Sequence, residues 1–310
     1  MIDFSEYPLV ETEWLAEHLT DSNLRIVDMR WRGDGSGREV YEAGHILGAI
    51  HLDWQHDLSW TDERGVRDLL LPPERFAAVM DEAGIGDKTR VVAYAETDHS
   101  GAARLWWALR YYGHDQVAVL NGGWTKWVTE GRVVSTDIPQ LLPANFTPRP
   151  RSNWLAVANE IEEAVNKSRP DVRLVDSRPP EQFKGRATWT PHGSLFLPPG
   201  QDWIEVTGGR VIRVGHIPGA VNMHASTNLN PENWTFLPVE ELRFMAQKAG
   251  IEPEQRVITY CGVGISASLG LFALYLAGYR NIALYDASWE EWGTDPKRLV
   301  ECEIEGGEVL

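Results

Sequence analysis

The same series of short motifs occurs twice, in the same order, along this 310-residue chain. Each copy has an apolar run ending in Asp-x-Arg, a Gly-His-Ile turn, a second apolar run ending in Tyr, and a segment with two tryptophans. The matching segments are 25–30 with 173–178, 44–49 with 215–220, 91–94 with 257–260, and 121–127 with 286–292. A repeat of this kind indicates the duplication of one folding unit, so the sequence predicts two similar domains.

Short apolar strands alternate with helical patterns in each copy. This alternation predicts an α/β fold in which a mainly parallel sheet is covered by helices on both faces. A proline-rich segment separates the copies and is typical of a semi-rigid linker. We therefore expect an N-terminal domain at 1–138, a linker at 139–153 and a C-terminal domain at 154–310.

The composition excludes several classes of function. A formal net charge of −16 argues against nucleic-acid binding, which requires a basic surface. No apolar run reaches membrane-spanning length, and the N-terminus lacks the pattern of a signal peptide, so we expect no membrane contact and a cytoplasmic location. The two cysteines, Cys261 and Cys302, agree with a reducing compartment. We predict no metal site and no other cofactor.

Cys261 stands where an apolar run ends and a helix of small residues begins. The loop after it contains Gly262 and Gly264, which can take the positive φ values that a cup of backbone N–H groups needs. This cup and the dipole of the following helix are expected to favour a thiolate. A phosphate-transfer loop would have arginine where this chain has Ala267, so the pattern favours sulfur transfer. The alternative for this loop alone is a buried structural cysteine.

The first copy has Ala95 at the position of Cys261. The loop after Ala95 reads Glu-Thr-Asp-His-Ser and contains no replacement thiol. We therefore predict one active domain, the second, and one inactive partner.

In this order the motifs resemble those of the tandem-domain rhodaneses, the thiosulfate and 3-mercaptopyruvate sulfurtransferases, over nearly the whole chain. The resemblance implies two rhodanese-like domains. It also implies that Cys261 takes a sulfur atom from a donor, carries it as a persulfide and passes it to a thiophilic acceptor such as cyanide, glutathione or thioredoxin. Backbone N–H groups of the active-site loop would hold the persulfide; the loop residues are Gly262, Val263, Gly264, Ile265 and Ser266.

The sulfur donor is less defined by the resemblance. Val263 stands where the mercaptopyruvate branch has a serine and the thiosulfate branch a lysine, and Gln182 replaces a basic residue expected before Phe183. By alignment, Leu69 and Gln55 occupy the positions of a His and an Asp of the first domain. We take thiosulfate as the favoured donor and 3-mercaptopyruvate as the alternative. The alternative from a different functional class is a non-catalytic pair of rhodanese domains that binds proteins or senses persulfides.

The remaining candidates surround the second copy. Lys184, Arg186 and Arg210 are candidate substrate cations, or else solvated surface charges. Asp176 and Arg178 are expected to form a structural brace under the loop, because the first copy keeps the same pair without a nucleophile. His45 and His216 are expected to pack in turns for the same reason. An insertion at 187–209, with Trp189, Phe196 and Trp203, is expected to form an apolar wall that selects a persulfide donor larger or less charged than thiosulfate.

Overall fold

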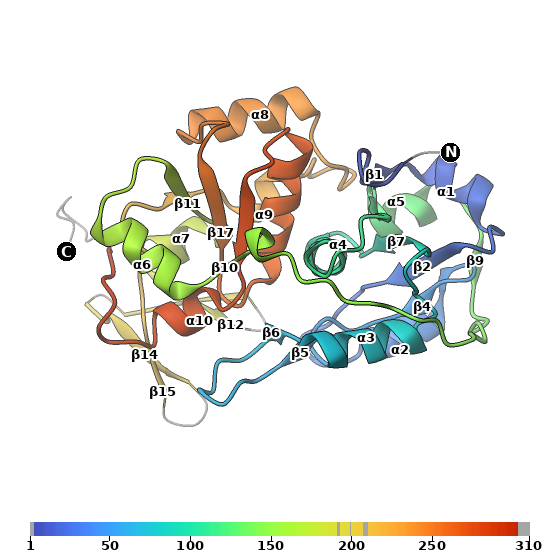
Figure 1. Ribbon diagram of the computed structural model, residues 1–310, viewed down its shortest axis with the longest axis horizontal. Coiled ribbons are helices and arrows are strands. Elements are labelled where there is room, and N and C mark those ends of the chain that lie inside the picture. The colour runs from blue at the N-terminus through green and yellow to red at the C-terminus, as the bar shows by residue number, and fades with distance from the viewer. Residues whose placement is uncertain (1–2, 191–192, 199, 207–209, 303–310) are drawn as a thin grey trace. The chain divides into compact units, whose positions relative to one another are not determined.

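The computed structural model describes residues 3–190, 193–198, 200–206 and 210–302 (Figure 1). The chain forms two compact units. The N-terminal unit consists of Met1–Trp60, Leu70–Trp154 and Leu229–Leu237. The C-terminal unit consists of Thr61–Leu69, Leu155–Asn228 and Pro238–Leu310.

The N-terminal unit contains a five-stranded sheet in the order β1-β8-β7-β2-β4. The strands are β1 (Leu9–Val10), β2 (Leu24–Asp28), β4 (Ile50–His51), β7 (Arg90–Tyr94) and β8 (Val117–Leu120). The helices are α1 (Thr12–His18), α2 (Gly37–Ala43), α3 (Pro73–Glu82), α4 (Ser100–Tyr111) and α5 (Gly123–Thr129). Short strands lie outside this sheet: β3 (His45–Ile46), β5 (Ser59–Trp60), β6 (Leu69–Leu70) and β9 (Val134–Ser135).

The C-terminal unit repeats this sheet in the order β10-β18-β17-β11-β16. The strands are β10 (Leu155–Ala156), β11 (Val172–Asp176), β16 (Val221–Asn222), β17 (Arg256–Tyr260) and β18 (Ile282–Tyr285). The helices are α6 (Ala158–Asn166), α7 (Pro180–Phe183), α8 (Val239–Lys248), α9 (Ile265–Leu276) and α10 (Ser288–Trp292). The 3₁₀ helices are η1 (Ser152–Trp154), which ends the N-terminal unit, and η2 (Ala225–Asn228).

The predicted α/β fold with two similar domains is confirmed. Every ladder in the two five-stranded sheets is parallel. The central strands also share one register, since Asp28 pairs with Tyr94 and Asp176 pairs with Tyr260. Runs rich in branched apolar residues suit strands that are covered on both faces, as β7 and β17 are. Helix α9 is apolar all round and packs against β17, β18 and α8, so it lies inside the unit.

The insertion of the second copy forms two antiparallel hairpins. Strand β12 (Ala187–Thr190) pairs with β13 (Gly193–Phe196), and β14 (Trp203–Val206) pairs with β15 (Arg210–Arg213). Residues 191–192, 199 and 207–209 of the insertion lie outside the described part of the chain. The hairpins therefore add a β layer that the first copy does not have at this point.

The two copies exchange an equivalent segment, which the repeat did not indicate. Thr61–Leu69 lies in the first half of the sequence but belongs to the C-terminal unit, and Leu229–Leu237 belongs to the N-terminal unit. Each segment precedes the matching helix, α3 or α8. Val66 is 5 % exposed and belongs to the hydrophobic core of the C-terminal unit. The domain limits expected at 138 and 153 stay predictions.

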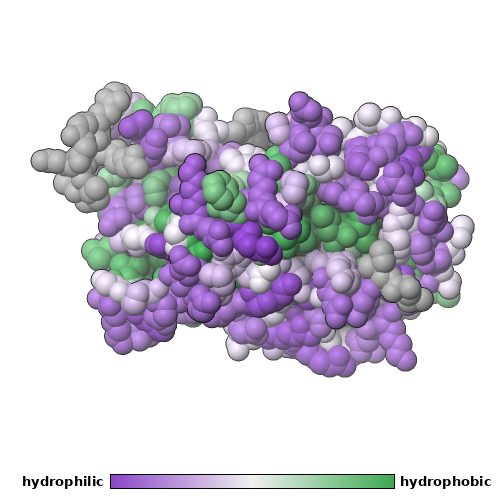
Figure 2. Space-filling model, turned by 90° about the horizontal axis from the view of Figure 1, so that it is seen from above, coloured by the Kyte–Doolittle hydropathy of each residue, from purple (hydrophilic) through white to green (hydrophobic). Residues whose placement is uncertain are grey.

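The surface agrees with the acidic, charge-rich composition. The face seen in Figure 2 is largely hydrophilic, with small hydrophobic areas between the polar ones. Within the described ranges, no helix combines the length and apolarity needed to span a bilayer.

Candidate active site

Cys261 directly follows β17 and is only 2 % exposed. Gly264 has a φ of 81° and forms the N-cap of α9, so this residue turns the end of the strand into the helix. The expectation that both loop glycines take positive φ is wrong for Gly262. One left-handed residue directly before α9 is enough to redirect the chain. The first N–H groups of α9 have no partner inside the helix, so they are directed toward the loop.

Helix α10 holds the Cys261 loop from the other side. The Cys261 N–H donates to Oγ of Ser288 at 3.1 Å, and this hydroxyl donates to the Tyr285 carbonyl oxygen at 2.8 Å. The N–H groups of Trp289 and Glu290 donate to the carbonyl oxygens of Cys261 and Gly262 at 3.0 Å and 2.9 Å. The first turn of α10 thus fixes the backbone on both sides of the Cys261 peptide.

Ser288 is the site residue that sequence reasoning missed. Its φ of 49° lies in the left-handed region, which is strained for a residue with a side chain. The matching residue of the first copy is Gly123, with a φ of 52°. A Cβ at Gly123 would collide with the carbonyl oxygen of Ala95. The signal was therefore present in the repeat, as a serine in the copy with Cys261 where the copy with Ala95 has glycine.

A buried ion pair lies under the loop, as expected. Arg178 Nη2 lies 2.5 Å from Asp176 Oδ2 and also donates to the Gly215 carbonyl oxygen at 2.6 Å. Its guanidinium carbon lies 4.5 Å from the centre of the Trp289 ring. Burial opposes the charge of Arg178, but the neighbouring Asp176 outweighs it and raises the Arg178 pKa. Burial and the Asp176 charge also raise the pKa of Tyr260 well above its ordinary value.

The N-terminal unit has the same brace without the nucleophile. Arg30 Nη2 lies 2.7 Å from Asp28 Oδ2 and donates to the Gly44 carbonyl oxygen at 2.6 Å. The two histidines pack as expected. His45 stacks on Tyr41 at 4.1 Å, and His216 stacks on Phe183 at 3.7 Å. The copy that has Ala95 in place of the thiol keeps the same ion pair and the same histidine packing, so none of these contacts depends on Cys261.

In the N-terminal unit, the loop that corresponds to the Cys261 loop contains His99. This side chain is buried, stacks on Phe236 at 5.4 Å between ring centres and places Nε2 2.7 Å from the Trp234 carbonyl oxygen. Burial lowers the pKa of His99, which favours the neutral ring. The exchanged segment Leu229–Leu237 therefore supplies contacts that hold the His99 ring.

The three candidate cations have different surroundings. Lys184 and Arg186 both face Glu181, at 4.0 Å and 3.6 Å, and have no described contact with the Cys261 loop. Arg210 donates through Nη1 to Glu290 Oε1 at 2.6 Å. Because the Glu290 N–H binds the loop, Arg210 alone of the three is connected to it through described contacts. A substrate-binding role for each of them stays a prediction.

The expected apolar wall of the insertion has exposed side chains. Trp189, Phe196 and Trp203 are 39 %, 66 % and 48 % exposed. Within the described ranges none of these three side chains makes a ring or hydrogen-bond contact with Cys261, so a role in donor selection stays a prediction. No cluster of three or more His, Cys, Asp or Glu side chains in the described part of the chain could hold a metal ion.

Comparison with known proteins identifies the class of protein that this fold and loop define. The family model of the rhodanese-like domain matches residues 11–130 and 157–295. The chain therefore belongs to the rhodanese family of sulfurtransferase enzymes, which use small-molecule sulfur donors and acceptors. Within this family it is of the two-domain, tandem type.

Individual relatives agree with this placement along the whole chain. The sulfur carrier protein TtuD of Thermus thermophilus is 33% identical over 97% of this chain and 97% of its own length. The thiosulfate sulfurtransferase of Corynebacterium glutamicum is 32% identical over 98% of this chain and 94% of its own length. The structure of the 3-mercaptopyruvate sulfurtransferase SseA of Escherichia coli is 26% identical, with a TM-score of 0.75 over 91% of this chain and 98% of SseA.

Proposed function

We propose that this chain transfers sulfur through a persulfide on Cys261, with thiosulfate as the favoured donor. The position of Cys261 carries the proposal: the thiol follows β17 in a loop held by the first turns of α9 and α10. The N-terminal copy has the same fold and the same brace, but Ala95 in place of the thiol. A loop maintained only for packing would not need the strained Ser288 that holds the Cys261 N–H.

The reaction has two displacement steps. The Cys261 thiolate attacks the outer sulfur of thiosulfate; a Cys–S–S⁻ bond forms, the sulfur–sulfur bond of thiosulfate breaks, and sulfite leaves with the electron pair. An acceptor then attacks the outer sulfur of the persulfide, and the Cys261 thiolate is the leaving group. Cyanide gives thiocyanate, and a thiol such as glutathione or thioredoxin gives its own persulfide. Backbone N–H groups of residues 262–266 stabilise the negative charge that develops on sulfur.

The second candidate donor is 3-mercaptopyruvate. The Cys-Gly pair at the start of the loop and the likeness to SseA favour it, whereas several relatives over the full chain length are named thiosulfate sulfurtransferases. A Cβ at Gly262 would meet no atom within 4 Å, so the loop has room for a larger residue or for part of a substrate there. Both reactions need free thiols, which is why a reducing, cytoplasmic setting is part of the proposal.

Intact-mass spectrometry tests the proposal and the donor together. The protein is incubated with thiosulfate or, separately, with 3-mercaptopyruvate, and then with cyanide. A gain of one sulfur atom that cyanide removes is expected with thiosulfate, and it should be absent from Cys261→Ser and present in Cys302→Ser. A gain of one sulfur atom with 3-mercaptopyruvate alone would identify 3-mercaptopyruvate as the donor in place of thiosulfate. No gain with either would favour a binding or persulfide-sensing protein.

A further inference from the structure

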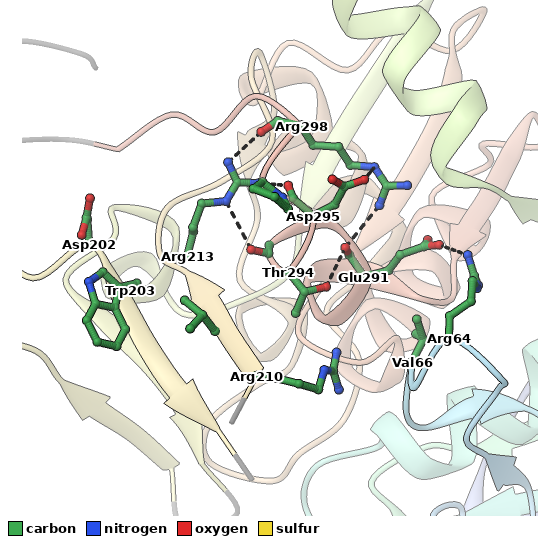
Figure 3. Close-up of a pocket in the computed structure, with 13 residues that line it drawn as sticks. Arg64, Val66, Asp202, Trp203, Arg210, Arg213, Glu291, Thr294, Asp295 and Arg298 are labelled. Atoms are coloured by element: carbon green, nitrogen blue, oxygen red, sulfur yellow. Dashed lines mark hydrogen bonds and ion pairs between the residues drawn. The ribbon is translucent and has the colours of Figure 1, made fainter. Parts of the chain in front are cut away.

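A cavity of about 760 Å³ lies in the C-terminal unit beside the hairpin of β14 and β15 (Figure 3). Its walls come from that hairpin, from the stretch that follows α10, and from the exchanged segment Thr61–Leu69. Cys261 and loop residues 262–266 do not belong to its lining. A volume of this size is in the range of small-molecule binding sites, so the charges in its lining that the protein leaves unpaired indicate what it can bind.

Several charged side chains that line the cavity are already paired with other groups of the protein. Arg213 donates to main-chain carbonyl oxygens, including that of Arg298 at 2.7 Å (Figure 3). The Nε of Arg298 lies 3.6 Å from Asp295 Oδ2. Glu291, which is 8 % exposed, is paired with Arg64. These contacts hold the walls together and leave little capacity for a ligand.

Arg210 has N–H donors that no described residue binds. Its Nη1 contacts the Gly65 carbonyl oxygen at 2.8 Å and Glu290 at 2.6 Å, whereas its Nε and Nη2 have no hydrogen-bond partner among the described residues. Arg67 binds the same carboxylate, with Nε 2.9 Å from Glu290 Oε1. Two guanidinium groups thus share the Glu290 carboxylate. A carboxylate ligand would complement the free edge of the Arg210 fork.

A negatively charged side chain also lines the cavity. Asp202 lies across the cavity from Arg64 and Val66 (Figure 3), and in the described part of the chain its carboxylate has no hydrogen-bond or ion-pair partner. The hairpin also supplies apolar side chains. Trp203 and Val211 are 48 % and 45 % exposed and lie on one face of it, because Trp203 pairs with Arg213 two residues beyond Val211.

We propose that this cavity binds a zwitterionic amino acid or short peptide. The carboxylate of the ligand binds Arg210, its ammonium group binds Asp202, and its apolar part packs against Trp203 and Val211. Charges of opposite sign in one cavity lining favour a ligand that carries both. An inorganic anion would satisfy only Arg210 and leave the apolar wall uncovered, so it would bind less tightly.

The test is isothermal titration calorimetry of the full-length protein with S-methylglutathione. This tripeptide has carboxylates and one ammonium group but no free thiol, so it cannot take sulfur from Cys261. We expect saturable binding with a dissociation constant of about 1 mM or below. Asp202→Asn and Arg210→Gln should each weaken binding about tenfold, as the loss of one charge-assisted contact does. Arg169→Gln, at an exposed ion pair with Asp171 outside the cavity, is the matched control and should bind normally.

A chemical change in the ligand gives a second, independent test. N-acetylation of S-methylglutathione removes the ammonium group; it should weaken binding to the wild type but add little loss in Asp202→Asn. Asp202 is exposed, so this variant is expected to fold, and Cys261→Ser should bind like the wild type even if no sulfur transfer is detected. The absence of saturable binding to the wild type, or equal binding by the wild type and Asp202→Asn, would overturn the proposal.

Discussion

The hydroxyl oxygen of Ser288 accepts the backbone N–H of Cys261, 27 residues earlier in the chain, at a distance of 3.1 Å. Both residues are buried, so this N–H has no access to solvent as an alternative partner. Ser288 holds this position at a φ of 49°, where the first copy has Gly123. The C-terminal unit therefore has local backbone strain at the residue that fixes the peptide of the candidate nucleophile.

Two substitutions at Ser288 separate the hydrogen bond from the strain. Ser288→Ala keeps the strained φ and leaves the Cys261 N–H unsatisfied, so we expect it to lower the free energy of unfolding by about 1–3 kcal/mol. Ser288→Gly loses the same bond but relieves the strain, so its loss should be smaller by about 1 kcal/mol. Urea unfolding measures both. Equal stability of the alanine variant and the wild type would contradict the assigned role of the hydroxyl.

The two cysteines are expected to differ in function. Cys261→Ala should abolish thiocyanate formation from thiosulfate and cyanide and leave the fold intact, because the thiol is the proposed carrier of sulfur. Among the residues that the structure describes, the Cys302 thiol donates to the Val214 carbonyl oxygen, and burial raises the pKa of this thiol, which disfavours the thiolate. Cys302→Ser should therefore retain activity. Steady-state assays and circular dichroism on both variants test this, and retained activity in Cys261→Ala would reject the mechanism.

The exchanged segment should contribute to the stability of the C-terminal unit. Val66 is 5 % exposed within that core, so Val66→Ala should lower the free energy of unfolding by about 1–3 kcal/mol. Val134 is 46 % exposed, and Val134→Ala serves as the control with an expected change within about 0.5 kcal/mol. Thermal unfolding of both variants measures these two changes in stability. Similar small changes in both would show that residues 61–69 do not support this core.

Glu130 should make the N-terminal unit sensitive to acid. Burial alone would raise the pKa of Glu130, but hydrogen bonds from Lys126 and Thr12 outweigh it and lower the pKa to about 2. Since this value lies below the ordinary 4.5, the ionised group stabilises the fold above pH 4.5, and this contribution disappears as the pH falls toward 2.

Glu130→Gln tests that pH dependence. The variant should be less stable than the wild type at pH 6 to 7 by at most about 1 kcal/mol, because the ion pairs are screened by solvent. The difference should shrink as the pH falls below 4.5. Unfolding measured across this range gives the result, and a difference that stays constant down to pH 3 would contradict it.

Much of the architecture could be predicted from the sequence. The parallel order of the sheets follows from alternating strand and helix patterns, and the position of Cys261 at the end of β17 follows from an apolar run that stops before glycines. The brace of Asp176 and Arg178 could be predicted because the first copy keeps the same pair without a cysteine. All of these depend on local patterns or on a comparison of the two copies.

Contacts between distant parts of the chain could not be predicted. The partner of Arg210 is Glu290, 80 residues later, and Arg67 binds the same carboxylate over a separation of 223 residues. The assignment of residues 61–69 to the C-terminal unit likewise depends on which core buries Val66. The sequence by itself determined the duplicated fold and the location of the thiol, because strand, turn and helix patterns are local. Only the tertiary structure decided which charges are paired and which face the cavity, because long-range packing sets those contacts.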